Sequence, residues 1–287
     1  MRRIGIFYAY WVQDWDVDFL PFIDKAHALG FEQLELSGGT IVGLSSAERA
    51  RLGDRASELG IALSYGIGLT PDHDPSSLDE KIRIDGIAFM KRMIDAVAEM
   101  GGGMIGGTVH SYWPASPPRD LAHKRAIREQ SIRSMRELAR HAQASGVVLN
   151  VEVINRFEQF LLNTCEEALS FVREVDSPAL GILLDTFHMN IEEDSIGGAI
   201  RLAGGSLNAL HIGETNRRPP GTGRMPWPEI REALDAIGFD GPLVMEPFVV
   251  PGGRIGHDIA LWRELAPAAE RDALAARALD FAKRTLR

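Results

Sequence analysis

The sequence predicts an α/β fold of the (β/α)8 barrel class, and three observations lead to that prediction. Eight short apolar runs alternate with segments whose apolar residues recur every three or four positions, as buried parallel strands alternate with amphipathic helices. The 287 residues contain no tract rich in proline, glycine and serine that would mark a linker. Barrels of this class commonly reach such a length as one domain. We therefore expect a single (β/α)8 TIM barrel domain over residues 1–287.

Eight short apolar runs are the predicted strands. They are rich in Val, Ile and Leu, and too apolar for strands that keep one face in water, so we expect burial on both faces. In chain order they are Arg3–Tyr8, Gln33–Leu36, Ala62–Gly66, Met104–Val109, Val147–Val153, Leu180–Asp185, Ala209–Ile212 and Leu243–Glu246. The first run continues into Tyr10 and Trp11 instead of a glycine-rich turn, and Gly101–Gly103 precedes a strand instead of a helix. Both features argue against a dinucleotide-binding fold.

The segments between these runs have the apolar spacing of amphipathic helices. The predicted helices are Asp18–Leu29, Ser45–Leu59, Ile82–Met100, Leu121–Ser145, Thr164–Val175, Ile196–Leu202, Trp227–Ile237 and Ala268–Leu286. The first four are each followed by glycine, the residue that most readily adopts the left-handed conformation at the end of a helix. Strand and helix therefore alternate along the whole chain, as a barrel requires.

Composition excludes several classes of function. The formal net charge is −9 and the basic residues are interspersed with acidic ones, whereas a nucleic-acid groove needs clustered Lys and Arg. The single cysteine, Cys165, cannot form an internal disulfide, which fits a reducing compartment. No signal peptide follows the two N-terminal arginines, and no apolar run approaches the length of a membrane span. We expect a cytoplasmic enzyme without nucleic-acid or membrane partners.

Four successive runs in the second half of the chain end in an acid or an imidazole. These residues are Glu152, Asp185, His211 and Glu246. Any one of them alone is better explained as an ion pair or a core histidine, but the carboxyl ends of barrel strands converge on one rim. Four buried polar groups without partners would be costly, so a divalent cation is the simpler explanation. Carboxylates with one imidazole suit Mn²⁺, Mg²⁺ or Co²⁺, and two open positions could take neighbouring oxygens of a polyol or hydroxyketone.

A second group of side chains follows the same strands. Glu158, His188 and Arg217 lie just after the fifth, sixth and seventh runs. A solvated ion pair would explain Glu158 or Arg217 alone, whereas a histidine three residues after a metal-binding aspartate favours a place over the pocket. Four aromatic residues also lie near the carboxyl ends of predicted strands, namely Phe7, Trp15, Trp113 and Phe248. Core packing would explain each of them singly, but together they predict an apolar wall for a sugar chain.

Four segments of the second half resemble a known family of enzymes. The segments VEVINRFEQF, LLDTFHMNIEE, HIGETNRRPPGTGRMPW and VMEPF closely resemble the ketose 3-epimerases, a family that includes the D-tagatose, D-psicose (allulose) and L-ribulose 3-epimerases. These belong to the wider xylose-isomerase-like barrel superfamily. The resemblance extends through almost the whole chain, from GIFYAYW to the C-terminal helix, and it is most specific between Glu152 and Phe248.

The resemblance implies roles for individual residues. Glu152, Asp185, His211 and Glu246 match the metal ligands of the family, which serve Mn²⁺, Co²⁺ or Mg²⁺, with Mn²⁺ the first expectation here. Glu152 and Glu246 also match its two catalytic carboxylates. Contacts around the first three carbons of the sugar are implied for Glu158, His188 and Arg217, and apolar contacts for Phe7, Trp15, Trp113 and Phe248. The implied substrate is a free ketohexose or ketopentose, and the implied assembly is a homodimer or homotetramer.

The resulting hypothesis is epimerisation at C3 of a ketose such as D-fructose/D-psicose, D-tagatose/D-sorbose or L-ribulose/L-xylulose. Glu152 and Glu246 would stand on opposite sides of C3, one removing the proton and the other returning it through an enediolate-like intermediate. Gly66 departs from some relatives, which have a polar side chain there, so no preference at C4 to C6 is transferred.

Other functions remain open on the sequence. An aldose–ketose isomerase or an inosose dehydratase could use the same barrel, and an isomerase would move a proton between C1 and C2. An abasic-site endonuclease would need more His and acidic ligands and a basic face, which the charge of −9 opposes. A non-catalytic sugar- or metal-binding protein is a further alternative, although such a protein has no need of two opposed carboxylates.

Overall fold

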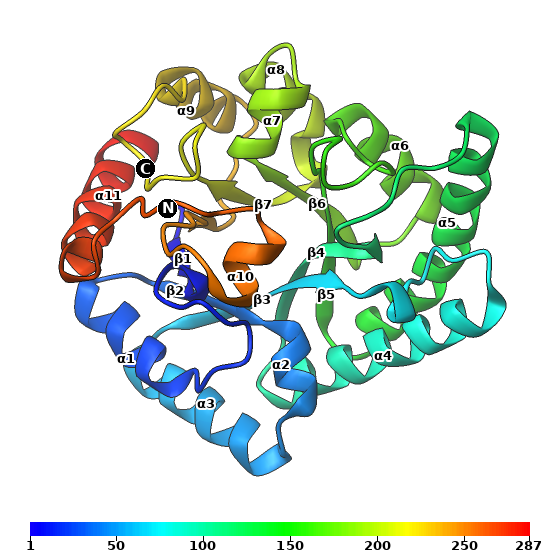
Figure 1. The fold of residues 1–287 in the computed structure, drawn as a ribbon, viewed down its shortest axis with the longest axis horizontal. Helices are drawn as coiled ribbons and strands as arrows, with labels where there is room; N and C mark the ends of the chain where they lie inside the picture. The colour runs from blue at the N-terminus through cyan, green and yellow to red at the C-terminus, as the bar shows by residue number, and fades with distance from the viewer.

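The strands close into one parallel barrel. A computed structural model describes residues 1–287, and in it each strand is hydrogen-bonded to its neighbours in chain order, with β8 paired to β1 (Figure 1). The strands are β1 Ile4–Phe7, β2 Gln33–Ser37, β3 Ala62–Leu69, β4 Gly103–Tyr112, β5 Val147–Glu152, β6 Leu180–Asp185, β7 Leu207–Ile212 and β8 Leu243–Met245. The predicted (β/α)8 barrel is confirmed.

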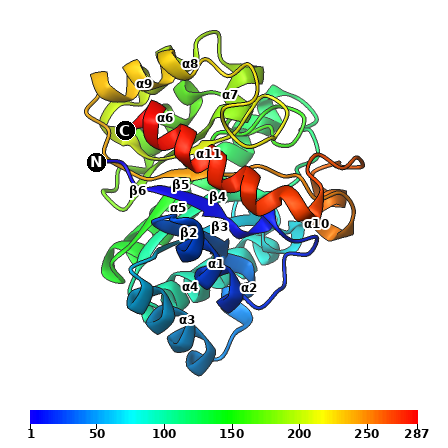
Figure 2. The same cartoon turned by 90° about the vertical axis from the view of Figure 1, so that its left-hand side faces the viewer.

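Most of the helices surround the barrel, and one lies over its centre (Figure 1). They are α1 Leu20–Leu29, α2 Gly38–Gly43, α3 Ser46–Leu59, α4 Glu80–Glu99, α5 Leu121–Ala144, α6 Cys165–Val175, α7 Thr186–Glu192, α8 Ile196–Ala203, α9 Trp227–Ala236, α10 Gly253–Asp258 and α11 Arg271–Leu286. In the turned view, β1 runs from the end of the molecule that carries both termini toward the end that carries α10 (Figure 2). No helix combines the length and the apolar composition needed to cross a lipid bilayer.

The strands are buried on both faces, as their continuous apolar sequences predict. Every residue of β1, β2 and β6 is buried. One cluster of 73 buried apolar residues fills the space within the barrel and between the strands and the helices, so the chain has one core. A polar side chain in such a strand must therefore find a partner inside the protein.

Helix ends follow the glycine and serine signals of the sequence. Gly30 and Gly60 end α1 and α3 in the left-handed conformation, with φ of 85° and 68°. At the start of α3, Ser45 accepts a hydrogen bond from the backbone N–H of Glu48, and the Glu48 side chain accepts one from Ser45 in return. This reciprocal arrangement satisfies two N–H groups that a helix start otherwise leaves unpaired.

Three short helices depart from the predicted arrangement. The sequence predicts no helix at α2, α7 or α10, and each has only six or seven residues, too few to show a period. His188, which follows the sixth predicted strand, lies in α7. The predicted helix Ala268–Leu286 begins as a 3-10 turn at Ala268–Glu270 before α11, and β4 extends beyond the predicted Met104–Val109. The barrel pairing of β4 with β3 and β5 extends that strand.

Candidate active site and metal centre

A cavity of about 410 Å³ opens at the carboxyl ends of the strands. This is the end of the molecule on which α10 lies, inside the ring of the outer helices (Figure 1). All of the site residues expected from the sequence line the cavity except Asp185; they are Phe7, Trp15, Trp113, Glu152, Glu158, His188, His211, Arg217, Glu246 and Phe248. The structure therefore brings together residues that are more than 200 positions apart in the chain.

The four strand-end residues form one cluster. One ligand atom from each of Glu152, Asp185, His211 and Glu246 lies within 4.8 Å of the other three. Nδ1 of His211 lies 3.7 Å from Oε1 of Glu152 and 3.5 Å from Oε1 of Glu246. β5, β6 and β7 end at Glu152, Asp185 and Ile212, and Glu246 follows β8 directly, so the barrel itself sets this spacing.

The donor set fits a divalent cation. Nδ1 of His211 is buried and has no hydrogen-bond partner, although three carboxylates surround it. A buried nitrogen of this kind is costly unless something binds its lone pair. Three carboxylates and one imidazole are ligands that Mn²⁺, Co²⁺ and Mg²⁺ accept, and there is no thiolate in the cluster to favour a closed zinc site. The cluster could therefore hold one metal ion.

Burial and mutual charge set the ionisation of this cluster. Burial raises the pKa of Glu152 well above its usual range and raises that of Asp185 to about 7. Burial opposes the charge on Glu246 too, but His211 and Arg217 outweigh it and hold the pKa of Glu246 low. Burial likewise opposes a charge on His211, but Glu35 and Glu246 outweigh it and raise the pKa of His211. Without a cation, the cluster must share protons to stay buried.

Arg217 supplies a fixed positive charge beside the cluster. Its Nη1 donates to Oδ2 of Asp185 at 3.1 Å and to Oε2 of Glu246 at 2.8 Å. The guanidinium group also lies over the rings of Phe187 and Phe248, at 4.1 Å and 5.2 Å from their centroids. The residue has a φ of 62°, a backbone conformation unusual for a side chain of this size. The loop after β7 thus holds Arg217 against both carboxylates.

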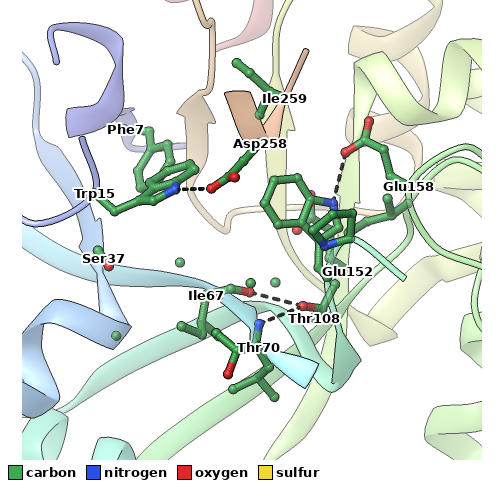
Figure 3. A pocket seen from close by; sticks show the side chains of 18 of the residues that line it. Phe7, Trp15, Ser37, Ile67, Thr70, Thr108, Glu152, Glu158, Asp258 and Ile259 are labelled. Atoms are coloured by element: carbon green, nitrogen blue, oxygen red, sulfur yellow. Dashed lines mark hydrogen bonds between the residues drawn. The ribbon is translucent and has the colours of Figure 1, made fainter. Parts of the chain in front are cut away.

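Glu158 and His188 also lie beside the cluster. Nε2 of His188 is 4.0 Å from Oε1 of Glu152 and 3.2 Å from Nη2 of Arg217. Oε2 of Glu158 accepts a hydrogen bond from the indole N–H of Trp113 at 3.0 Å (Figure 3). Glu152, Glu158 and His188 line the same cavity.

The aromatic residues form the apolar part of the cavity wall. The rings of Phe7 and Trp15 lie 6.2 Å apart, and the ring of Phe248 lies 6.1 Å from Phe7. Phe7 and Trp15 stand on one side of the view in Figure 3, with Glu152 and Glu158 on the other. The indole N–H of Trp15 donates to Asp258 at 2.8 Å, which ties this wall to the end of α10 (Figure 3).

Glu35 is a site residue that the sequence reasoning missed. It lies in β2, is 5% exposed, and its Oε1 is 3.0 Å from Nε2 of His211. Its other oxygen accepts from Ser64, which in turn accepts from the side chain of Gln33. The signal was a charged residue inside the apolar run QLELS. A metal-binding histidine commonly directs its second nitrogen at such a carboxylate, so Glu35 completes the environment of His211.

Gly66 lies beside the same carboxylate. A Cβ atom at this position would be 3.2 Å from Oε1 of Glu35 and 3.6 Å from the ring of Phe7. Gly66 also lines the cavity. The glycine therefore leaves room for Glu35 in addition to removing a polar contact from the cavity wall.

Comparisons with known proteins agree with this architecture. Residues 23–284 match the model of a family described as xylose isomerase-like TIM barrel. The chain is 44% identical to D-psicose 3-epimerase of Ruminiclostridium cellulolyticum over 98% of this chain and 97% of that protein. It is 32% identical to L-ribulose 3-epimerase of Mesorhizobium japonicum, over 92% and 88%. A crystal structure of D-psicose 3-epimerase with D-tagatose from Clostridium cellulolyticum H10 superimposes with a TM-score of 0.96 at 43% identity, covering 99% of both chains.

Proposed function

The chain belongs to the xylose isomerase-like TIM barrel family and is a ketose 3-epimerase, and we propose that it inverts C3 of a free ketohexose or ketopentose by a two-carboxylate mechanism. One observation carries the mechanism: Glu152 and Glu246 approach the same nitrogen of His211 from different strands, at 3.7 Å and 3.5 Å. Inversion needs one group to take a proton and another to return it on the opposite face. Two carboxylates from β5 and the end of β8 meet that need without turning the sugar.

The surroundings of the two carboxylates differ. Burial favours the protonated form of Glu152, whereas His211 and Arg217 favour the carboxylate form of Glu246. Which of them removes the C3 proton depends on which epimer is bound, and the roles exchange when the reaction runs in reverse.

We propose that Glu152, Asp185, His211 and Glu246 hold one divalent ion, with Mn²⁺ as the first expectation and Co²⁺ or Mg²⁺ as alternatives. When bound, such an ion stabilises negative charge on neighbouring substrate oxygens and makes the adjacent C–H more acidic. The assigned contacts for the oxygens of C1 to C3 are Glu158, His188 and Arg217. Phe7, Trp15, Trp113 and Phe248 would pack against the carbon chain and keep water from the reacting carbon.

The substrate range follows the relatives. D-Fructose/D-psicose is the first pair to test, since the relatives at 41–44% identity are D-psicose 3-epimerases, followed by D-tagatose/D-sorbose and L-ribulose/L-xylulose.

We also propose that the protein acts in the cytoplasm as a homodimer or homotetramer. Exposed apolar side chains such as Phe157 and Trp262, which are 79% and 69% exposed, support self-association, and the mass in solution tests it.

The decisive experiment follows the position of the exchanged proton. The purified protein is incubated with each ketose and Mn²⁺ in D₂O, and the products are separated and examined by NMR. A 3-epimerase incorporates deuterium at C3, whereas an aldose–ketose isomerase incorporates it at C1 or C2 and a dehydratase releases water. Unchanged ketose without deuterium would indicate a binding protein and contradict the proposal. Chelation should stop the exchange and added Mn²⁺ should restore it.

A further inference from the structure

Asn155 lies between two side chains that we assign to the substrate, although the mechanism above does not use it. The residue is 1% exposed and follows β5 in the chain. Its Nδ2 lies 2.9 Å from Oε1 of Glu158 and 2.7 Å from Nδ1 of His188. A carboxylate only accepts hydrogen bonds, and Oδ1 of Asn155 accepts from the backbone N–H of Phe157 at 2.9 Å. Two independent contacts therefore fix the orientation of the amide.

Two donors consequently meet at Nδ1 of His188. One is the amide Nδ2 of Asn155, and the other is the backbone N–H of the same residue, at 3.3 Å. A ring nitrogen that two donors approach must present its lone pair, so the proton of the neutral ring lies on Nε2.

The opposite nitrogen, Nε2, is directed toward Arg217. The distance from Nε2 of His188 to Nη2 of Arg217 is 3.2 Å, and both residues line the cavity. A guanidinium group has no acceptor, so an N–H of His188 and an N–H of Arg217 face each other. Both N–H groups can form hydrogen bonds only when a third group that carries lone pairs lies beside them. A sugar oxygen is such a group.

We propose that Asn155 is a positioning residue for epimerisation, because its amide fixes His188 as the tautomer with the proton on Nε2. His188 and Arg217 then form a two-donor site for the substrate oxygen that gains negative charge when the C3 proton leaves. The identity of that oxygen rests on the proposed function, whereas the tautomer of His188 does not. The same amide holds Glu158, so one side chain sets the direction of two substrate contacts.

The tautomer can be measured in the protein without substrate. Two-bond ¹H–¹⁵N correlation spectra of protein labelled with ¹⁵N-histidine and loaded with diamagnetic Mg²⁺ distinguish protonated from unprotonated ring nitrogens. The signals of His188 are identified by their loss in His188→Gln. We expect wild type to show a proton on Nε2 and none on Nδ1 at neutral pH. Asn155→Asp replaces the donor by an acceptor and should transfer the proton to Nδ1, whereas Asn155→Ala should give a mixture.

Kinetics of the same variants test the consequence for turnover. We expect Asn155→Asp to lower kcat about 10²-fold, the usual effect of losing one donor to a developing oxyanion, with a smaller change in KM. Asn163→Asp is the matched control, because Nδ2 of Asn163 donates hydrogen bonds to the carbonyls of Ile154 and Gln159 in the same loop. That variant should leave the tautomer of His188 unchanged even if the loop is weakened.

Three results would overturn the proposal. They are a proton on Nδ1 in wild type, an unchanged tautomer in both Asn155 variants, and a transferred proton in Asn155→Asp without loss of kcat. Failure of the proposed function has a different signature. Wild type would then show the expected tautomer but epimerise no ketose, and the assignment of His188 would stand without the substrate.

Discussion

The four strand-end residues differ in how many of their side-chain oxygen and nitrogen atoms already form hydrogen bonds within the protein. Oδ1 of Asp185 accepts from the backbone N–H of Phe187 at 2.6 Å, and Oδ2 accepts from Arg217. Asp185 does not line the cavity, whereas Glu152 and Glu246 do. We propose a division of labour in which Asp185 and His211 mainly hold an ion while the two glutamates also move protons, and the absence of Asp185 from the cavity wall supports its part.

That division makes the two glutamates the sensitive positions for turnover. Glu152→Gln and Glu246→Gln keep a side-chain oxygen as ligand but lose the group that exchanges a proton, so we expect kcat to fall by at least about 10²-fold. Mn²⁺ affinity, measured by calorimetry, should fall less in these variants than in Asp185→Ala. Near wild-type turnover in either glutamine variant would rule out the two-base scheme.

Glu35 is expected to act on the metal through His211. Glu35→Gln removes the negative charge opposite Nε2 of His211, 3.0 Å away, and should weaken Mn²⁺ binding about 10- to 100-fold. Glu32→Gln is a suitable control, since Glu32 precedes the same strand but pairs with Arg287 near the chain ends. Calorimetric titration of metal-free protein is the measurement. Equal affinity in wild type and Glu35→Gln would show that this carboxylate is only part of the core.

The metal cluster could be predicted from the sequence because its four members share one signal, a polar residue at the end of an apolar run. Glu35 has the same chemistry but lies within its run, where the direction of its side chain depends on how the barrel closes. Asn155 gave no signal, since an asparagine in a loop is usually explained by turn formation. Both roles depend on which atom of a histidine faces which neighbour, and a linear pattern does not contain that information.

At the scale of elements, the loop between β7 and α9 is organised by one buried carboxylate. Glu214 is fully buried and accepts hydrogen bonds from the backbone N–H groups of Gly221, Thr222 and Met225 and from the indole of Trp227. The loop carries Arg217 between these contacts. Charge-assisted bonds of this kind are stronger than neutral ones, so Glu214 holds the loop that presents the guanidinium group.

Glu214→Gln is therefore expected to affect both stability and catalysis. An amide can replace only one of the two carboxylate oxygens as acceptor, which should cost about 1–3 kcal/mol and loosen residues 215–226. We expect a lower Tm, faster proteolytic cleavage within the loop and a reduced kcat/KM. Glu229→Gln is the control, because Glu229 accepts from Gly197 and Ser195 at the start of α8. Equal cleavage rates in both variants would contradict a role specific to Arg217.

The alternation of strands and helices could be predicted because long buried segments have a clear period and a glycine or serine at their ends. The short helices α2, α7 and α10, which the sequence does not predict, depend on tertiary contacts. The start of α7 is capped by Asp185, a residue already explained as a metal ligand, and in α10 the backbone N–H of Ile255 donates to the carbonyl of Gln13. Helices of six or seven residues are marginal by themselves, so no local sequence pattern could establish them.

At the scale of the whole molecule, His110 should make stability depend on pH. It is fully buried in β4, neither ring nitrogen has a hydrogen-bond partner, and burial lowers its pKa to about 3. The unfolded chain therefore binds one more proton than the folded chain between roughly pH 6.5 and pH 3, so stability falls as the pH falls through that window. The loss attributable to His110 amounts to about 2 kcal/mol between about pH 7.5 and pH 5.

His110→Leu tests this linkage. The leucine cannot gain a proton and leaves no hydrogen bond unmade, so we expect the free energy of unfolding in urea to decrease less between pH 7.5 and pH 5, by about 2 kcal/mol. His123→Leu is the control, because His123 lies in the first turn of the exposed start of α5. Parallel pH profiles for wild type and His110→Leu would show that His110 has the same pKa in the folded and the unfolded chain.

The two ends of the chain lie side by side and are hydrogen-bonded to each other at the end of the barrel away from α10 (Figure 2). Arg2 donates to the carbonyl of Leu286 at 2.6 Å, and Arg287 donates to the carbonyl of Arg2 at 3.1 Å. A short peptide linker could therefore join them into a covalent ring without crossing the cavity. By the chain-entropy relation, closing a loop of 287 residues would stabilise the protein on the order of 5 kcal/mol. Attachment to a solid support through that linker would leave the mouth of the barrel facing the solution.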